Sequence, residues 1–198
     1  MCGIINVVIK MEFDKIDNPE KLLEFMSENI KYGFVGKNGK VYNNQNSEDW
    51  NDWYEQCLVQ TGDQVLKTKV GTCWDQVEME RLWFEKRNYE IKTIFIWFEV
   101  NYENDYPTHT FLLYQKNGKW YWFENSFEAC RGIHEFNTIE EAIECVKTRQ
   151  LEYAISIGVA KQEDKEFIKD YEYSKLVSPL NVDEYINHVT TSVDKKQL

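Results

Sequence analysis

Positive charge is scarce in this sequence. Its 198 residues include 23 Lys and Arg against 34 Asp and Glu, which gives a formal net charge of −11 at pH 7. Nucleic acids and anionic membrane surfaces select for clustered basic side chains, so this balance argues against both. We therefore expect no nucleic-acid partner and no membrane partner, and we leave the oligomeric state open.

Paired cysteines and long apolar runs are missing as well. The five cysteines are widely spaced and include no Cys-x-x-Cys motif, which argues against a disulfide framework and against a zinc site. We expect no metal and no other cofactor. The N-terminal apolar run, residues 4–9, is too short to cross a membrane, and no signal peptide is visible. A reducing cytoplasm is the expected compartment.

Aromatic residues, by contrast, are abundant. They make up 15% of the chain and include seven Trp, which favours a packed domain over a disordered chain. No repeat, low-complexity segment or linker divides the sequence, so we expect one domain over residues 1–198 with its core at about 60–160. Helix signals come first and strand signals later, which predicts an α+β fold with an antiparallel sheet packed against an N-terminal helical part.

Capping residues and hydrophobic periodicity give the individual elements. They predict helices over residues 19–30, 47–60, 73–87, 138–150, 162–171 and 182–188, strands over 4–11, 91–100, 109–114, 120–125 and 151–159, and a small hairpin over 34–42. The first four residues, Met1-Cys2-Gly3-Ile4, also resemble the start of glutamine amidotransferases with an N-terminal cysteine nucleophile. Such enzymes need a long two-layer β sandwich with its own Arg and Asn-Gly motifs, which we do not find. We therefore favour the strand.

One cysteine stands at a predicted helix start. Gly71 allows a tight approach, Thr72 is a good N-cap, and Asp75 follows three residues later as in a capping box. Cys73 is thus at the first helical position, where free backbone N–H groups and the helix dipole favour thiolate over thiol. The carboxylates of Asp75 and Glu78 oppose this effect. A nucleophilic Cys73 therefore needs a base from elsewhere, and otherwise it is a small buried residue.

A predicted hairpin supplies such a base. Asn117-Gly118 lies between two apolar runs and predicts a tight turn that joins strands 109–114 and 120–125. Side chains alternate between the faces of a strand, so His109 and Glu124 are expected to be neighbours at the open end of the hairpin. In thiol catalysis an imidazole takes the thiol proton and an acid orients the imidazole.

Together these residues resemble the transglutaminase-like branch of the papain-like cysteine enzymes. The matching segments are Gly71-Thr72-Cys73-Trp74, His109-Thr110-Phe111 and residues 120–127. That family has Gly-x-Cys at a helix start, a His that opens a strand, and a strand that ends in Trp-x-x-x-Asp before an aromatic residue. The order and approximate spacing agree. Glu124 stands where the family usually has Asp, and Phe111 where it usually has Trp.

The resemblance implies a papain-like or transglutaminase-like domain with Cys73, His109 and Glu124 as a catalytic triad. Asn125 is the alternative third member, because papain itself uses Asn in that role, although strand parity favours Glu124. The implied function is that of a cysteine-dependent acyl-group hydrolase or transferase acting on a protein or peptide. Bacterial members of the family are often hydrolases, so protease-like activity is expected before cross-linking.

Two further points stay open at this stage. No side chain is assigned to the oxyanion hole, because the distance of Gln60 and Gln64 from Cys73 does not match papain's glutamine, and the Cys73 backbone N–H is the expected donor. The alternative function is a non-catalytic protein-interaction domain on the same scaffold, which the acidic residues near Cys73 would suit.

Overall fold

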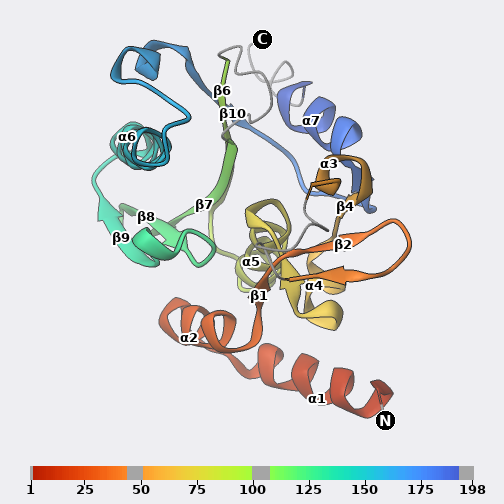
Figure 1. Cartoon of the computed structure of the whole chain (residues 1–198). Helices are drawn as coiled ribbons and strands as arrows, with labels where there is room; N and C mark the ends of the chain where they lie inside the picture. Colours follow the sequence, from red (N-terminus) through yellow and green to blue (C-terminus); the bar gives the residue numbers. More distant parts are fainter. Residues whose placement is uncertain (1, 44–50, 100–107, 192–198) are drawn as a thin grey trace.

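The computed structural model describes residues 2–43, 51–99 and 108–191 of the chain (Figure 1). The α-helices are α1 (Cys2–Lys15), α2 (Pro19–Asn29), α3 (Trp53–Gln56), α4 (Gly62–Thr68), α5 (Cys73–Lys86), α6 (Ile139–Ser156) and α7 (Val182–Thr191). The strands are β1 (Lys31–Tyr32), β2 (Phe34–Gly36), β3 (Val41–Tyr42), β4 (Cys57–Val59), β5 (Val70–Gly71), β6 (Ile91–Phe98), β7 (Thr108–Lys116), β8 (Lys119–Glu124), β9 (Gly132–Phe136), β10 (Ile168–Glu172) and β11 (Leu180–Asn181). Two 3-10 helices, η2 (Glu128–Cys130) and η3 (Gln162–Phe167), complete the described elements.

The main sheet has five strands in the order β10-β6-β7-β8-β9, and every neighbouring pair is antiparallel. A smaller antiparallel sheet has the order β11-β4-β2-β3. The short strands β1 and β5 pair in parallel. Mixed helices and antiparallel sheets make this an α+β protein, as the sequence predicts.

The main sheet separates two hydrophobic cores. Side chains such as Leu112 and Phe123 pack on the face toward α5, whereas Phe111 and Trp122 pack on the face toward α6. Figure 1 shows α5 and α6 on different sides of the sheet. Alternation along the β7–β8 hairpin therefore assigns each residue to one core or the other.

The predicted hairpin and the helix that follows Thr72 are both confirmed. Asn117 and Gly118 have positive φ values of 55° and 76°, as a tight turn between β7 and β8 requires. Helix α5 begins at Cys73, as predicted, and is buried at nearly every position up to Phe84. A Cβ on Gly62 of α4 would lie 2.4 Å from the Glu78 carbonyl oxygen, so glycine lets these two helices touch.

The strand predicted over residues 4–11 is wrong, because these residues belong to helix α1. The side chains of Ile9, Phe13 and Ile16 are buried in the larger core. Their spacing of four and then three residues fits one face of a helix. Burial of this stripe thus overrides the local β propensity of the early isoleucines and valines.

The helix predicted over residues 47–60 is also largely wrong. Residues 47–50 lie outside the described residues, and α3 covers only Trp53–Gln56. Residues 57–59 form strand β4 instead, which pairs with β2 and β11. Pairing with strands far away in the chain decides the conformation here, and a local pattern does not show such partners.

Two predictions after β9 also need correction, because packing and strand pairing with distant segments again override the local pattern. The segment 151–159 is mostly helical, because α6 continues to Ser156 and buries Leu151 and Ala154 on the same side as Val146. The helix predicted over 162–171 ends at Phe167, and the following residues form β10 along the edge of β6. The helix predicted over 182–188 is present as α7, and the hairpin predicted over 34–42 as β2–β3.

Candidate active site

The start of α5 is fixed by a buried carboxylate. Asp75 accepts hydrogen bonds from the Gln60 backbone N–H at 2.6 Å, the Thr72 backbone N–H at 2.7 Å and the Thr72 hydroxyl at 2.8 Å. Burial outweighs these bonds and raises the pKa of Asp75 to about 6. A Cβ on Gly71 would lie 2.7 Å from the Asp75 Cβ, so the approach predicted at this glycine is confirmed. These contacts hold Cys73 at the first helical position.

The hairpin brings His109 and Glu124 together. The register pairs Leu112 with Phe123, which places Glu124 opposite Phe111 and on the same face as His109. His109 Nε2 lies 2.8 Å from Glu124 Oε2, and both side chains are buried. The expected neighbour relation between these two side chains is therefore present in the structure.

The Glu124 carboxylate receives four hydrogen bonds, which leaves it little freedom to move. Besides His109, the Trp122 indole N–H donates to it at 3.1 Å, the Ser126 hydroxyl at 2.9 Å and the Phe127 backbone N–H at 2.7 Å. Although burial acts in the other direction, the charge of His109 holds the pKa of Glu124 below its ordinary value. Glu124 is thus an anion with a fixed orientation toward the imidazole.

Cys73 lies on the other side of the same imidazole. Burial acts to lower the pKa of His109, but the charge of Glu124 and hydrogen bonds with Cys73 and Glu124 outweigh it and raise this pKa to about 10. Since Nε2 is bound to Glu124, the other ring nitrogen, Nδ1, is left for the sulfur. Helix α5 and the His109 side chain belong to opposite faces of the sheet, and they meet where β7 begins.

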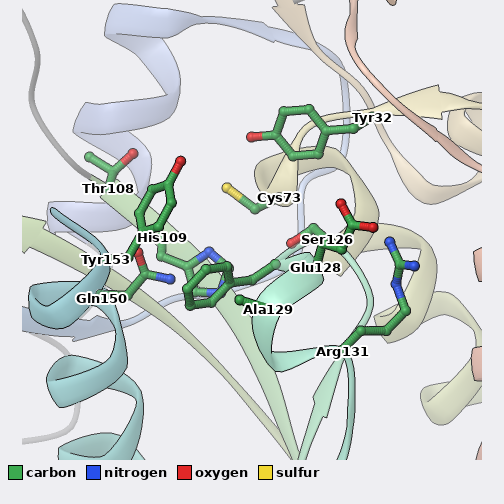
Figure 2. Close-up of a pocket in the computed structure, with 11 residues that line it drawn as sticks. Tyr32, Cys73, Thr108, His109, Ser126, Glu128, Ala129, Arg131, Gln150 and Tyr153 are labelled. Atoms are coloured by element: carbon green, nitrogen blue, oxygen red, sulfur yellow. The ribbon is translucent and has the colours of Figure 1, made fainter. Parts of the chain in front are cut away.

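Cys73 and His109 both line a pocket of about 730 Å³. Figure 2 shows the Cys73 sulfur pointing into this pocket, with Tyr32 on one side of it and His109 on the other. Phe127 contributes an aromatic wall, and its ring lies 5.9 Å from the ring of His109. Gln150 and Tyr153 of α6 reach the pocket from the far side. A substrate in this pocket can therefore contact both the sulfur and the imidazole.

Asn125 does not take the place of Glu124 at the imidazole. Its amide Nδ2 donates to Gln76 Oε1 at 2.7 Å, and Gln76 in turn donates to the Gly71 carbonyl at 2.9 Å. Asn125 thereby ties the end of β8 to the loop that precedes Cys73. The two glutamines considered for the oxyanion hole are also occupied elsewhere: Gln60 Nε2 donates to the Val70 carbonyl, and the Gln64 side chain accepts from Thr61.

Sequence reasoning missed several parts of this site. Tyr32 lies on β1, a two-residue strand that no periodic pattern can reveal. Gln76 looked like one more polar residue on a helix, and the pocket wall around Glu128 belongs to a 3-10 turn with no sequence signature of its own. The Trp122 indole could have been found, because strand parity puts it on the face of Glu124.

The comparisons with known proteins add no family to these observations. No protein-family model matches the chain, and no curated protein matches it. Over the described ranges, no cluster of three or more His, Cys, Asp or Glu side chains is placed to hold a metal ion. Nor does any helix in the described part of the chain combine the length and apolarity needed to cross a bilayer.

Proposed function

We propose that this protein is a cysteine-dependent acyl-group hydrolase or transferase with Cys73, His109 and Glu124 as its triad. The observation that carries the proposal is the position of the His109 ring, which lines the same pocket as the Cys73 sulfur (Figure 2) and whose Nε2 lies 2.8 Å from Glu124 Oε2. A papain-like fold of the transglutaminase-like branch is part of the same proposal. It is supported by the order of the three residues and by the helix start at Cys73.

The first half-reaction follows from these positions. Because its pKa is raised to about 10, His109 holds the thiol proton as an imidazolium, and the Cys73 thiolate attacks the carbonyl carbon of an amide or ester to form a tetrahedral oxyanion. The intermediate collapses as the C–N or C–O bond breaks, and the imidazolium gives its proton to the leaving amine or alcohol. Glu124 keeps the ring in place and stabilises its positive charge. The product is a thioester on Cys73.

The second half-reaction returns the enzyme. Neutral His109 removes a proton from water or from an amine, which attacks the thioester carbonyl, and the departing sulfur leaves as the thiolate. Water gives a carboxylic acid and an amine gives a new amide. We propose a protein or peptide as the substrate, with hydrolysis ahead of acyl transfer, because the pocket opens to solvent beside the exposed Tyr153.

An acylation experiment tests the proposal. The full chain is treated with p-nitrophenyl acetate, release of nitrophenol is followed, and the acetylated residue is located by peptide mass mapping. We expect acetyl transfer to Cys73 and its loss in Cys73→Ala. Cys145→Ala is the matched control, since Cys145 is a partly buried free thiol on α6. Equal nitrophenol release by wild type and Cys73→Ala, with both folded, would refute the proposal.

The alternative, a non-catalytic interaction domain, rests on the acidic groups of α5, whose negative charges would oppose a thiolate at Cys73. Burial raises the pKa of Glu78 to about 7 and that of Glu80 well above its ordinary value. Both shifts favour the neutral form, so these groups oppose a thiolate less than their number suggests. We therefore rank the enzyme first, and a Cys73 that is not acylated in the experiment above would support the interaction domain.

A further inference from the structure

The proposed reaction needs hydrogen-bond donors for the oxyanion, and α5 supplies one by its geometry. The first backbone N–H groups of a helix have no partner within the helix, and Cys73 is the first residue of α5. The Thr72 carbonyl accepts from the N–H groups of Asp75 and Gln76, which lie farther along the chain. The Cys73 N–H is thus placed beside its own sulfur. A side chain on the pocket wall can supply a second donor.

Tyr32 is held in position by the chain segment that leads to Cys73. Strand β1 pairs in parallel with β5, and the register sets Tyr32 against Gly71, two residues before Cys73. The N–H groups on both sides of Tyr32 are bonded to this segment: Lys31 donates to the Lys69 carbonyl at 2.9 Å and Gly33 to the Gly71 carbonyl at 3.4 Å. The backbone of Tyr32 therefore cannot move far relative to α5.

The Tyr32 hydroxyl faces the sulfur from the side opposite to the base. Figure 2 shows the ring extending from β1 so that its oxygen approaches Cys73, whereas His109 lies beyond the sulfur. In a tetrahedral intermediate on sulfur, the leaving group must lie near His109, so the oxyanion points away from it. Although Tyr32 is 37% exposed overall, desolvation of its hydroxyl and the charge of Cys73 raise its pKa well above the ordinary value, so the phenol stays protonated and able to donate.

The other polar groups on the pocket wall are less suited to this role. The Ser126 hydroxyl donates to Glu124 at 2.9 Å, and Arg131 Nε donates to the Asn125 carbonyl at 3.0 Å. Gln150 lies across the pocket with α6, on the side of His109 (Figure 2). We propose that the Tyr32 hydroxyl and the Cys73 backbone N–H together form the oxyanion hole, an inference that rests on the proposed function.

Two reactions of the same sulfur separate this role from a structural one. Acylation by p-nitrophenyl acetate passes through an oxyanion, whereas alkylation by iodoacetamide displaces iodide from a saturated carbon and forms none. Loss of one oxyanion donor typically lowers the rate by about 10²- to 10³-fold. We expect Tyr32→Phe to lower the acylation rate constant by about 10²-fold and to leave the alkylation rate constant within roughly threefold of wild type.

The control is Tyr121→Phe, which removes a hydroxyl that donates to Glu135 at 2.9 Å on the exposed surface of the sheet. It is expected to leave both rates unchanged. Unchanged acylation in Tyr32→Phe, or an equal fall in acylation and alkylation, would overturn the role of Tyr32 while leaving the triad intact. A wild-type protein that is alkylated at Cys73 but never acylated would overturn the proposed function and this inference with it.

Discussion

At the residue scale, Glu124 has more hydrogen-bond donors around it than any neutral side chain could accept from. Its two oxygens take bonds from His109, Trp122, Ser126 and the Phe127 backbone. A glutamine at this position would turn an N–H₂ group toward some of these donors, and it would also remove the charge that stabilises the imidazolium. The carboxylate, and not merely a polar group of this size, is therefore what the site is built to hold.

We expect Glu124→Gln to lower the acylation rate of Cys73 by about 10²- to 10⁴-fold, as loss of the orienting acid does in comparable triads. The measurement is nitrophenol release at neutral pH. Glu135→Gln is the matched control, because Glu135 lies on the adjacent strand β9 and its partners, the Tyr121 hydroxyl and Lys119, are at the surface. An acylation rate within twofold of wild type in Glu124→Gln would contradict the assigned role.

The His109–Glu124 pair also predicts a pH dependence of stability. The pKa of His109 is raised to about 10 in the folded chain, against an ordinary value of about 6.5 in an unfolded one. The imidazolium thus stabilises the fold fully below about pH 6.5, and this contribution is lost as the pH rises toward 10. In urea unfolding experiments across this window, the free energy of unfolding should fall more steeply with pH in wild type than in Glu124→Gln. Parallel curves would contradict the ion pair.

At the scale of elements, the loop between β5 and α5 does most to place the sulfur. Asp75 holds this loop by accepting from Gln60 and Thr72, so the helix start depends on a few buried bonds. Helix α6 begins in a related way, because the Thr138 hydroxyl accepts from the Glu141 backbone N–H at 3.1 Å. The effects of removing the two capping hydroxyls can therefore be compared, since only the helix start at Thr72 carries Cys73.

We expect Thr72→Ala to lower the free energy of unfolding by about 1–3 kcal/mol, because a buried carboxylate loses a hydrogen bond. Thr138→Ala, its matched control, should lose about 1 kcal/mol from its exposed cap. Acylation of Cys73 should fall in Thr72→Ala and stay unchanged in Thr138→Ala. Urea unfolding and nitrophenol release measure the two effects, and equal acylation by both variants would show that the cap does not position the sulfur.

At the scale of the whole molecule, α5 carries acidic side chains that are buried in the fold. Glu78 accepts from the Leu176 backbone N–H at 3.2 Å, and its second oxygen lies 3.6 Å from Arg81 Nε. Burial outweighs these contacts and raises the pKa of Glu78 to about 7. The folded chain thus binds this proton more tightly than the unfolded chain does, and stability falls as the pH rises from about 4.5 to 7.

Glu78→Gln should flatten this part of the stability profile. The amide keeps the size of the side chain and cannot ionise. The free energy of unfolding of the variant should therefore fall less than that of wild type between about pH 4.5 and 7. Urea unfolding at several pH values measures the difference. If the free energies of unfolding of the two proteins differ by the same amount at every pH in this range, the assignment of a raised pKa to Glu78 is contradicted.

The sequence predicts those parts of the fold that local signals specify. The turn at Asn117-Gly118 and the cap at Thr72 each act within a few residues, and both are found as expected. Strand parity then brings His109 beside Glu124 without any knowledge of the rest of the chain. The site could be anticipated this far because alternation along a hairpin is a local property.

The rest depends on contacts between distant segments. Residues 4–11 become helical because Ile9 and Phe13 find an apolar core, and residues 57–59 become a strand because β2 and β11 lie beside them. Tyr32 reaches the pocket through pairing with a segment about forty residues away in the sequence. Such pairings are decided by packing over the whole molecule, which propensity in a short window does not show.

The central claim is that His109 accepts the thiol proton of Cys73 and so makes Cys73 a nucleophile. The pH dependence of Cys73 alkylation tests this claim most directly. The rate constant for iodoacetamide is measured from about pH 5 to 9 in wild type and in His109→Gln, with modification located by peptide mapping. His134→Gln is the control, because His134 is not among the residues that line the pocket. Its ring Nε2 lies 2.8 Å from the Cys130 carbonyl oxygen. We predict rapid alkylation at about pH 6 in wild type and the control, and its loss in His109→Gln. Profiles that coincide in all three proteins would contradict the account.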